Sequence, residues 1–109
     1  MARSTASAVP VFAALGDPQR MVLVSRLSQE GPLSLTDLAD GSSITRQAVT
    51  KHLRVLESAG LARCERLGRE TRWQLDRRPL ALARDHLDTI SRQWDKAIER
   101  LKRFVEDDG

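Results

Sequence analysis

The chain has 109 residues, of which 40% are hydrophobic and 30% charged, and it carries a formal net charge of +3. These values describe one globular domain with a modest core rather than a disordered chain. The single cysteine excludes an internal disulfide and a zinc cluster built from the cysteines of one chain. No apolar run reaches the length of a membrane span, and the first residues lack a secretory signal pattern, so we expect a cytoplasmic protein.

Positive charge is concentrated in the middle of the chain. From Arg46 to Arg78 there are nine Lys or Arg residues and four Asp or Glu residues. Of the totals of 18 and 15, this leaves nine basic and eleven acidic residues for the rest of the chain. A basic segment within a slightly acidic protein predicts that the middle of the chain binds an anionic partner.

The first part of the chain predicts a tail and two helices. Residues 1–8 are rich in Ala, Ser and Thr and are expected to form a flexible tail. Residues 9–15 are expected to form a short apolar helix. Asp17 followed by Pro18 is a start signal, because an N-cap residue precedes a proline at the first helical position. The helix that it opens is expected to run to about Glu30, where a Gly-Pro pair follows.

A helix-turn-helix unit is predicted next. Ser34 can cap a brief helix, a Gly-Ser-Ser turn follows, and Thr45 can cap a second helix that extends to about Ser58. One face of this second helix is apolar, and the Arg, Lys and Gln of the other face match bases and phosphates of a major groove. The residues expected to contact DNA from this helix are Thr45, Arg46, Gln47, Thr50, Lys51, His52 and Arg54. For His52 the sequence leaves two interpretations open, a phosphate contact or packing at the border of the apolar face.

After Gly60 the hydrophobic period changes from about 3.6 residues to about 2, which indicates strands. Residues 62–65 and 71–75 alternate apolar and polar side chains, and residues 68–70 lie between them at hairpin length. A helix-turn-helix followed at once by a two-stranded hairpin is a winged helix. Its wing is expected to hold phosphates or a minor groove through a cluster of three arginines, Arg66, Arg69 and Arg72.

From Pro79 the helical period returns, and apolar residues step alternately by three and four positions, as in a coiled coil. This seam either folds back on its own core or pairs with a second copy. We favour the second copy, because a two-fold dimer buries the surface symmetrically. The residues expected at the dimer interface are Val11, Phe12, Leu87, Ile90, Trp94, Ala97, Leu101 and Phe104. The predicted fold is mainly α with a small β-hairpin, in which a winged helix-turn-helix at residues 9–78 precedes a dimerisation helix at residues 79–106.

Four segments of the chain are distinctive: Leu15-Gly16-Asp17-Pro18-Gln19-Arg20, residues 34–39, residues 44–61, and Gly68-Arg69-Glu70. Over about residues 9–106 they resemble the arsenic-repressor (ArsR/SmtB) family of bacterial winged-helix regulators. The most specific part is the run of residues 48–56 with Ala-Gly-Leu closely behind it. The resemblance implies a homodimeric repressor that places the helix from Thr45 in the major groove of a palindromic operator. It also implies that the hairpin acts as the wing and that a ligand releases the protein from DNA.

Residues that bind metal in many members of that family are replaced in this chain. Where such members carry two cysteines, this sequence reads Pro32-Leu33-Ser34-Leu35-Thr36-Asp37-Leu38, so the thiolate ligands are missing. Asp85, His86 and Asp88 partly match a second metal site of the family, but no second histidine follows. We therefore expect no metal and no cofactor, and we interpret His86 as a surface residue. A small-molecule or redox effector is left open, although Cys64 is expected to be a small buried hydrophobe.

Other classes of function fit the sequence less well than DNA binding. No set of residues combines a nucleophile, a base and an orienting group, so we do not expect an enzyme. A basic winged helix also fits a protein-interaction module with an acidic partner, or a nucleic-acid binder without sequence preference. The glutamine among the basic residues favours sequence-specific DNA binding, because it adds a base-reading group that charge attraction does not need. We therefore predict a DNA-binding transcriptional regulator.

Overall fold

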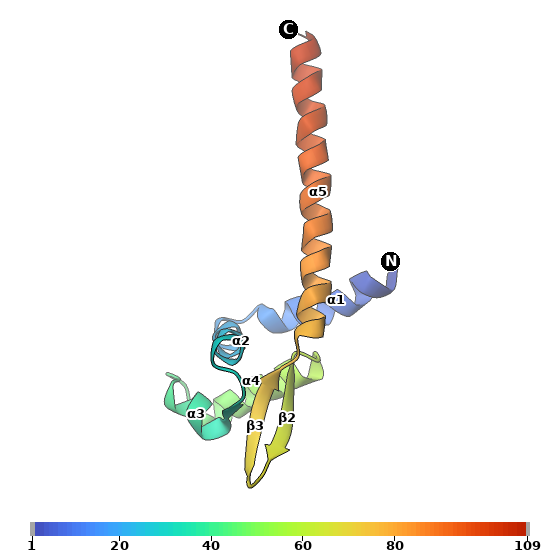
Figure 1. Ribbon diagram of the computed structural model, residues 1–109. Helices are drawn as coiled ribbons and strands as arrows, with labels where there is room; N and C mark the ends of the chain where they lie inside the picture. Colours follow the sequence, from blue (N-terminus) through green and yellow to red (C-terminus); the bar gives the residue numbers. More distant parts are fainter. Residues whose placement is uncertain (1, 109) are drawn as a thin grey trace.

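The computed structural model describes residues 2–108. The elements along the chain are α1 (Ala2–Leu15), α2 (Pro18–Glu30), β1 (Leu33–Ser34), α3 (Leu35–Asp40), α4 (Arg46–Ser58), β2 (Ala62–Leu67), β3 (Glu70–Leu75) and α5 (Arg77–Asp108). Figure 1 shows a small unit from which α5 stands out on one side, while the β2–β3 hairpin points to the other. The molecule is therefore elongated, with extents of 70 × 30 × 20 Å. Helices predominate over a small sheet, which confirms the predicted fold class.

The helix-turn-helix is held in place by one apolar core. The stripe predicted for α4 is confirmed, because Val49, Leu53 and Leu56 are completely buried. Leu38 of α3 and Leu61, just before β2, are buried to the same degree. Since burying one such side chain contributes roughly 1.5–3 kcal/mol, the inner face of α4 fixes the rotation of this helix. The side chains on its outer face are thereby fixed as well.

The predicted starts of α2 and α3 are confirmed by their caps. The carboxylate of Asp17 accepts hydrogen bonds from the backbone N–H groups of Gln19 at 2.9 Å and Arg20 at 3.1 Å. These bonds, the one from Arg20 above all, hold the pKa of Asp17 below its usual value. At α3, the hydroxyl of Ser34 accepts a hydrogen bond from the N–H of Asp37 at 3.1 Å. Both caps satisfy backbone donors that have no partner within the helix.

The first helix is longer than predicted. We expected a flexible tail over residues 1–8, whereas α1 begins at Ala2; Met1 lies outside the described residues. Three side chains at three-residue spacing along α1 are buried, namely Ala8, Val11 and Ala14. The helix packs against α5. This packing and the helix propensity of alanine outweigh Pro10, which removes one backbone hydrogen bond from the helix.

The sheet has three strands, one more than predicted. β2 and β3 pair in antiparallel register along their whole lengths, and β1 pairs with the other edge of β3, where Leu33 lies opposite Trp73. Two residues are too few for an alternating pattern, which is why the sequence did not reveal β1. The hairpin turn is also tighter than predicted. Glu70 already belongs to β3, so only Gly68 and Arg69 connect the two strands.

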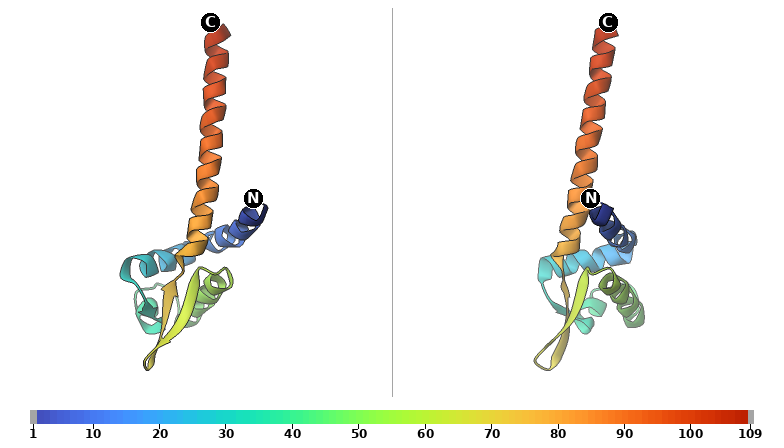
Figure 2. Two further views of the ribbon diagram at one scale, coloured as in Figure 1. Left: turned by 45° about the vertical axis from the view of Figure 1, so that its right-hand side comes forward. Right: turned by 90° about the vertical axis from the view of Figure 1, so that its right-hand side faces the viewer.

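The last helix is longer at both ends than the predicted residues 79–106. Asp76 precedes it and accepts a hydrogen bond from the backbone N–H of Arg78 at 3.0 Å, which gives the helix its cap. At about 1.5 Å per residue, α5 is about 48 Å long. Figure 2 shows from two more directions that its C-terminal half stands clear of the other elements. Neither α5 nor another helix within residues 2–108 has the length and apolar character to cross a membrane.

Candidate nucleic-acid interface

The second helix of the helix-turn-helix, α4, is fixed at both ends. The hydroxyl of Thr45 accepts a hydrogen bond from the N–H of Ala48 at 3.1 Å, as predicted for an N-cap. At the other end Gly60 has a φ of +78°, and the N–H of Leu61 donates to the carbonyl of Leu56 at 2.9 Å. This is the Schellman arrangement, which a glycine in the left-handed region permits. Both predicted boundaries of α4 are confirmed.

Two polar stripes run along the exposed side of α4. Gln47, Lys51 and Arg54 follow one another at spacings of four and three residues, on the side opposite the buried stripe. Arg46, Thr50 and Arg54 follow one another at spacings of four and line a groove between α4 and the sheet. Arg54 therefore belongs to both stripes. An exposed polar helix face of this kind fits the major groove of DNA, which admits an α-helix.

Thr50 and His52, two of the residues predicted to contact DNA from α4, make side-chain contacts within the chain that bear on their roles. The hydroxyl of Thr50 donates to the carbonyl of Arg46 at 3.0 Å, so its methyl group and lone pairs are left for a base. His52 is half-buried, and its Nδ1 lies 3.4 Å from a guanidinium nitrogen of Arg20 and 3.9 Å from the carboxylate of Asp17. These contacts turn His52 toward the junction of α1 and α2. They favour the packing interpretation of His52 over a phosphate contact.

The wing presents its arginines on two faces. Arg66 and Arg72 belong to neighbouring cross-strand pairs, and neighbouring pairs point to opposite faces of a sheet. They therefore do not form the single cluster that we predicted. Arg72 also makes an ion pair with Glu70 at 2.8 Å, which offsets part of its charge. Arg69 lies at the tip beside Gly68, whose φ of +67° permits the two-residue turn.

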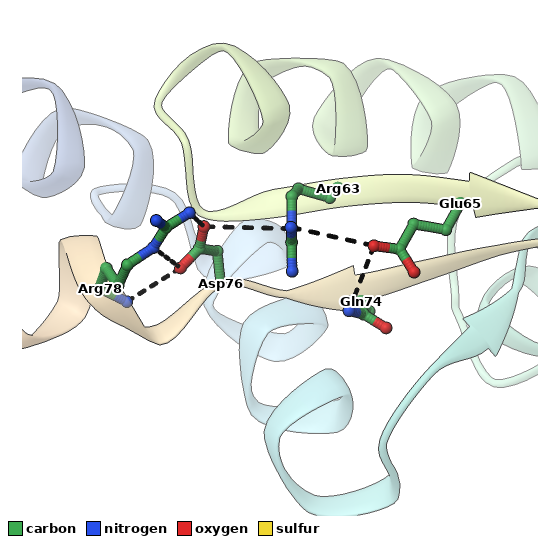
Figure 3. Close-up of polar contacts among 5 residues, drawn as sticks. All are labelled: Arg63, Glu65, Gln74, Asp76 and Arg78. Atoms are coloured by element: carbon green, nitrogen blue, oxygen red, sulfur yellow. Dashed lines mark hydrogen bonds and ion pairs between the residues drawn. The ribbon is translucent and has the colours of Figure 1, made fainter.

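Part of the excess positive charge of residues 46–78 is neutralised by acidic side chains of the same chain. Figure 3 shows the carboxylate of Asp76 next to two guanidinium groups, with Arg78 at 2.7 Å and Arg63 at 4.0 Å. The hydrogen bonds from Arg78 lower the pKa of Asp76 to about 2. On the same face, Glu65 lies 3.9 Å from Arg63 and 3.4 Å from Gln74. This network joins the base of the wing to the start of α5.

Four cations of α4 and the wing are exposed and make no ion pair with any described residue. They are Arg46, Lys51, Arg66 and Arg69. Because these charges are not offset within the chain, they are free to attract an anionic partner. In Figure 1, α4 and the wing lie in the half of the molecule away from the free end of α5. The free positive charge and the polar face of α4 thus belong to the same half of the molecule.

The groove between α4 and the sheet has a volume of about 620 Å³. One wall is the stripe of Arg46, Thr50 and Arg54, and the other includes Cys64 of β2 and Trp73 of β3. Cys64 is half-buried and packs against the core, so it is less enclosed than we expected. Trp73 was not among the predicted site residues. Its place in the alternating pattern of residues 71–75, on the inward side, was the only signal for it.

The seam predicted on α5 is exposed in the single chain. Its large side chains keep 48–67% of their surface accessible, namely Leu87, Ile90, Trp94, Leu101 and Phe104. Ala97, between them, is half-buried. Single exposed apolar residues are normal, whereas a continuous row along one helix is typical of surfaces that bind another protein.

Contacts of α1 change two further predictions. Val11, which we predicted at the dimer interface, is only 1% exposed and belongs to the core of its own chain. Phe12 is half-buried and packs on His86 of α5, with the ring centroids 6.1 Å apart. His86 is therefore a packing residue and not the free surface residue that we expected. Within residues 2–108 of one chain, no three His, Cys, Asp or Glu side chains gather in a group that could hold a metal ion.

A helix-turn-helix with an exposed polar face, free cations and a wing defines the class of winged-helix DNA-binding proteins. Comparisons with known proteins agree with this class. A family model described as "Helix-turn-helix domain" matches residues 15–65. The chain is 37% identical over 97 residues to the HTH-type transcriptional regulator Rv2034 of Mycobacterium tuberculosis. The aligned residues make up 88% of this chain and 86% of that protein.

Two further relatives are informative. A transcriptional repressor SmtB homolog of Synechocystis is 36% identical over 80 residues, which covers 72% of this chain and 60% of that protein. The solved structure of an ArsR-like transcriptional regulator from Rhodococcus superimposes with a TM-score of 0.80 at 31% identity and covers 92% of this chain and 93% of that one. The chain belongs to the ArsR/SmtB family of winged helix-turn-helix transcriptional regulators, as the sequence predicted.

Proposed function

We propose that the protein is a homodimeric repressor that binds a palindromic operator in double-stranded DNA. In this proposal α4, from about Thr45 to Ser58, lies in the major groove, and the wing contacts the adjacent backbone. The observation that carries the proposal is the set of four unpaired cations on α4 and the wing. A helix whose inner face is fully buried can present base-reading groups without reorganising, which favours binding.

The roles of the side chains follow from their places on these elements. Gln47 and Lys51 lie on the outward stripe in the first two turns of α4, the part that usually reaches base edges in this motif. Arg46 lies beside the groove next to the wing, where a backbone phosphate fits. Arg66 and Arg69 hold phosphates or the minor groove from the wing. Arg72 contributes less, because Glu70 offsets its charge.

The exposed seam of α5 supports the homodimer. A second copy can cover this row of apolar side chains symmetrically, and the two wings then face two half-sites about one helical turn apart. The similarity to a protein named a transcriptional repressor supports repression as the regulatory outcome.

The function is tested by selecting bound fragments from random or genomic DNA with the purified protein. Gln47→Ala is then expected to change the preferred base at one position of each half-site, at roughly 1–3 kcal/mol. Arg69→Ala is expected to weaken binding to all sequences by similar factors and to make the salt dependence shallower, by about one phosphate per subunit. Both variants are measured on a panel of single-base operator changes at two salt concentrations.

Each outcome has a clear meaning. If no sequence is enriched, the protein binds DNA without sequence preference or does not bind it. If Arg69→Ala alters the base preference while Gln47→Ala is neutral everywhere, the wing reads the sequence and the two roles are reversed.

A further inference from the structure

One arginine of α4 is held in place although it is exposed. The Cζ atom of Arg54 lies 5.3 Å from the centroid of the Trp73 ring, within the range of a cation–π contact. The same guanidinium donates to the carboxylate of Glu57 at 2.9 Å. Yet the side chain of Arg54 keeps 61% of its surface accessible. Its position is thus set by an aromatic ring below it and an acid beside it.

The ring below Arg54 is a fixed platform. Trp73 is 4% exposed and lies in the central strand, with Leu33 of β1 on one side and Cys64 of β2 on the other. Because it is buried between these neighbours in a close-packed core, the indole has little room to reorient. The platform is part of the wall of the groove between α4 and the sheet, so it holds the guanidinium at that groove.

We propose that Trp73 positions Arg54 to bind one backbone phosphate of the DNA strand that lies in the groove between α4 and the wing. This proposal rests on the DNA-binding function proposed above. A guanidinium has five N–H donors, and the planar fork that Glu57 leaves free fits two phosphate oxygens. Arg46 and Arg72 line the same groove, as do Asp37 and Glu70, so three cations against two acids give the lining a net charge of +1. Arg54 is then a backbone contact, although it also ends the outward stripe of α4.

Trp73 is expected to strengthen DNA binding because it restricts the side chain of Arg54 before the DNA binds. A long side chain loses rotamer freedom when it binds, and this loss weakens binding. A platform that already restricts the side chain reduces that loss. Glu57 holds the guanidinium in the free protein, and its carboxylate then competes with the phosphate for the same donors.

The test is a double-mutant cycle on DNA affinity. We expect Trp73→Leu to weaken operator binding roughly two- to fivefold per subunit, which corresponds to a cation–π contact of about 0.5–1 kcal/mol, and hence roughly 5- to 30-fold for a dimer on two half-sites. In an Arg54→Ala background the same substitution is expected to have no further effect. Arg54→Ala alone is expected to make the salt dependence shallower by about one phosphate per subunit and to leave base preference unchanged. Trp73→Phe keeps an aromatic face, so its operator affinity is expected to be close to that of the wild-type protein.

A second measurement leaves the core intact, in case Trp73→Leu does not fold. Glu57→Gln removes the carboxylate charge that competes with the phosphate, so it is expected to tighten operator binding. The gain in affinity is expected to be smaller in an Arg54→Ala background. Glu99→Gln on α5 is the matched control and is expected to leave affinity unchanged. Melting curves of all variants show which of them are folded.

Three results overturn the proposal. If Trp73→Leu or Trp73→Phe weakens binding equally with and without Arg54, Trp73 only supports the wing. If Arg54→Ala changes base preference without a change in salt dependence, Arg54 reads a base. If Arg54→Ala is neutral while Gln47→Ala and Lys51→Ala weaken binding, the proposal fails but the DNA-binding function stands. If instead the wild-type protein selects no operator at all, the proposed DNA-binding function is refuted as well.

Discussion

Replacing Trp94 by Glu is expected to convert a dimer into monomers. Trp94 lies in the seam of α5 and keeps 67% of its surface exposed in the single chain. A tryptophan offers about 150–250 Å² for burial, so roughly 100–170 Å² per copy is left for a partner. At about 25 cal/mol per Å², this is about 2.5–4 kcal/mol per copy and twice that per dimer. The dissociation constant is expected to rise by roughly three orders of magnitude or more, since each 1.4 kcal/mol is about a factor of ten.

Sedimentation velocity at micromolar concentration measures this change directly. Arg92→Glu is the control, because it places a glutamate on α5 two residues away but outside the seam, and its change of charge (−2) is larger than that of Trp94→Glu (−1). We expect the control to sediment as a dimer and Trp94→Glu as a monomer. The monomer is also expected to bind the operator more weakly, because its two half-sites are no longer held together.

The seam interpretation has two possible refutations. One is a Trp94→Glu protein that remains a dimer at micromolar concentration. The other is a wild-type protein that is a stable monomer and still binds one palindromic site at full strength. Either result would mean that the apolar row on α5 has another partner.

Three further predictions concern stability, metal and pH. Leu53→Ala, at a fully buried site, is expected to lower the free energy of unfolding by about 2–5 kcal/mol in urea titrations, whereas Val55→Ala, 41% exposed, is expected to have a much smaller effect. Zinc, cadmium and arsenite are expected to leave DNA affinity unchanged, and release of a labelled operator at stoichiometric metal would reveal a ligand set, such as one formed across a dimer. The lowered pKa of Asp76, about 2 instead of 3.8, stabilises the fold fully above about pH 4 and progressively less as pH falls toward 2. The melting temperature of Asp76→Asn is therefore expected to fall less than that of the wild-type protein between pH 5 and pH 2.

The features that the sequence predicted are those with local causes. Thr45 and Gly60 mark the ends of α4 because a cap and a left-handed glycine act within a few residues. The buried stripe of α4 follows from the spacing of three apolar residues. The residue types on α4 and the wing predicted DNA contacts, and the family resemblance added a homodimeric repressor that a ligand releases from its operator.

The features that the sequence did not predict depend on contacts between distant segments. β1 exists only because β3 offers it an edge, and Arg66 and Arg72 are separated only by the register of the hairpin. Periodicity marked Val11 as apolar but did not tell whether the core or a partner would cover it. The contact of Arg54 with Trp73 joins a helix to a strand and has no sequence signature.

The short strand β1 divides the wing into two parts. β3 has a neighbour on each side at Arg72 and Trp73, whereas Thr71 and Glu70 pair with β2 alone. Opening the two-stranded end breaks fewer hydrogen bonds and exposes little buried surface, because residues 66–71 are already exposed. Amide hydrogens near Trp73 are therefore expected to exchange slowly with solvent, and those at the tip rapidly. Arg69 is carried by the part that opens easily and can adjust to the DNA surface, while the base of the wing keeps its shape.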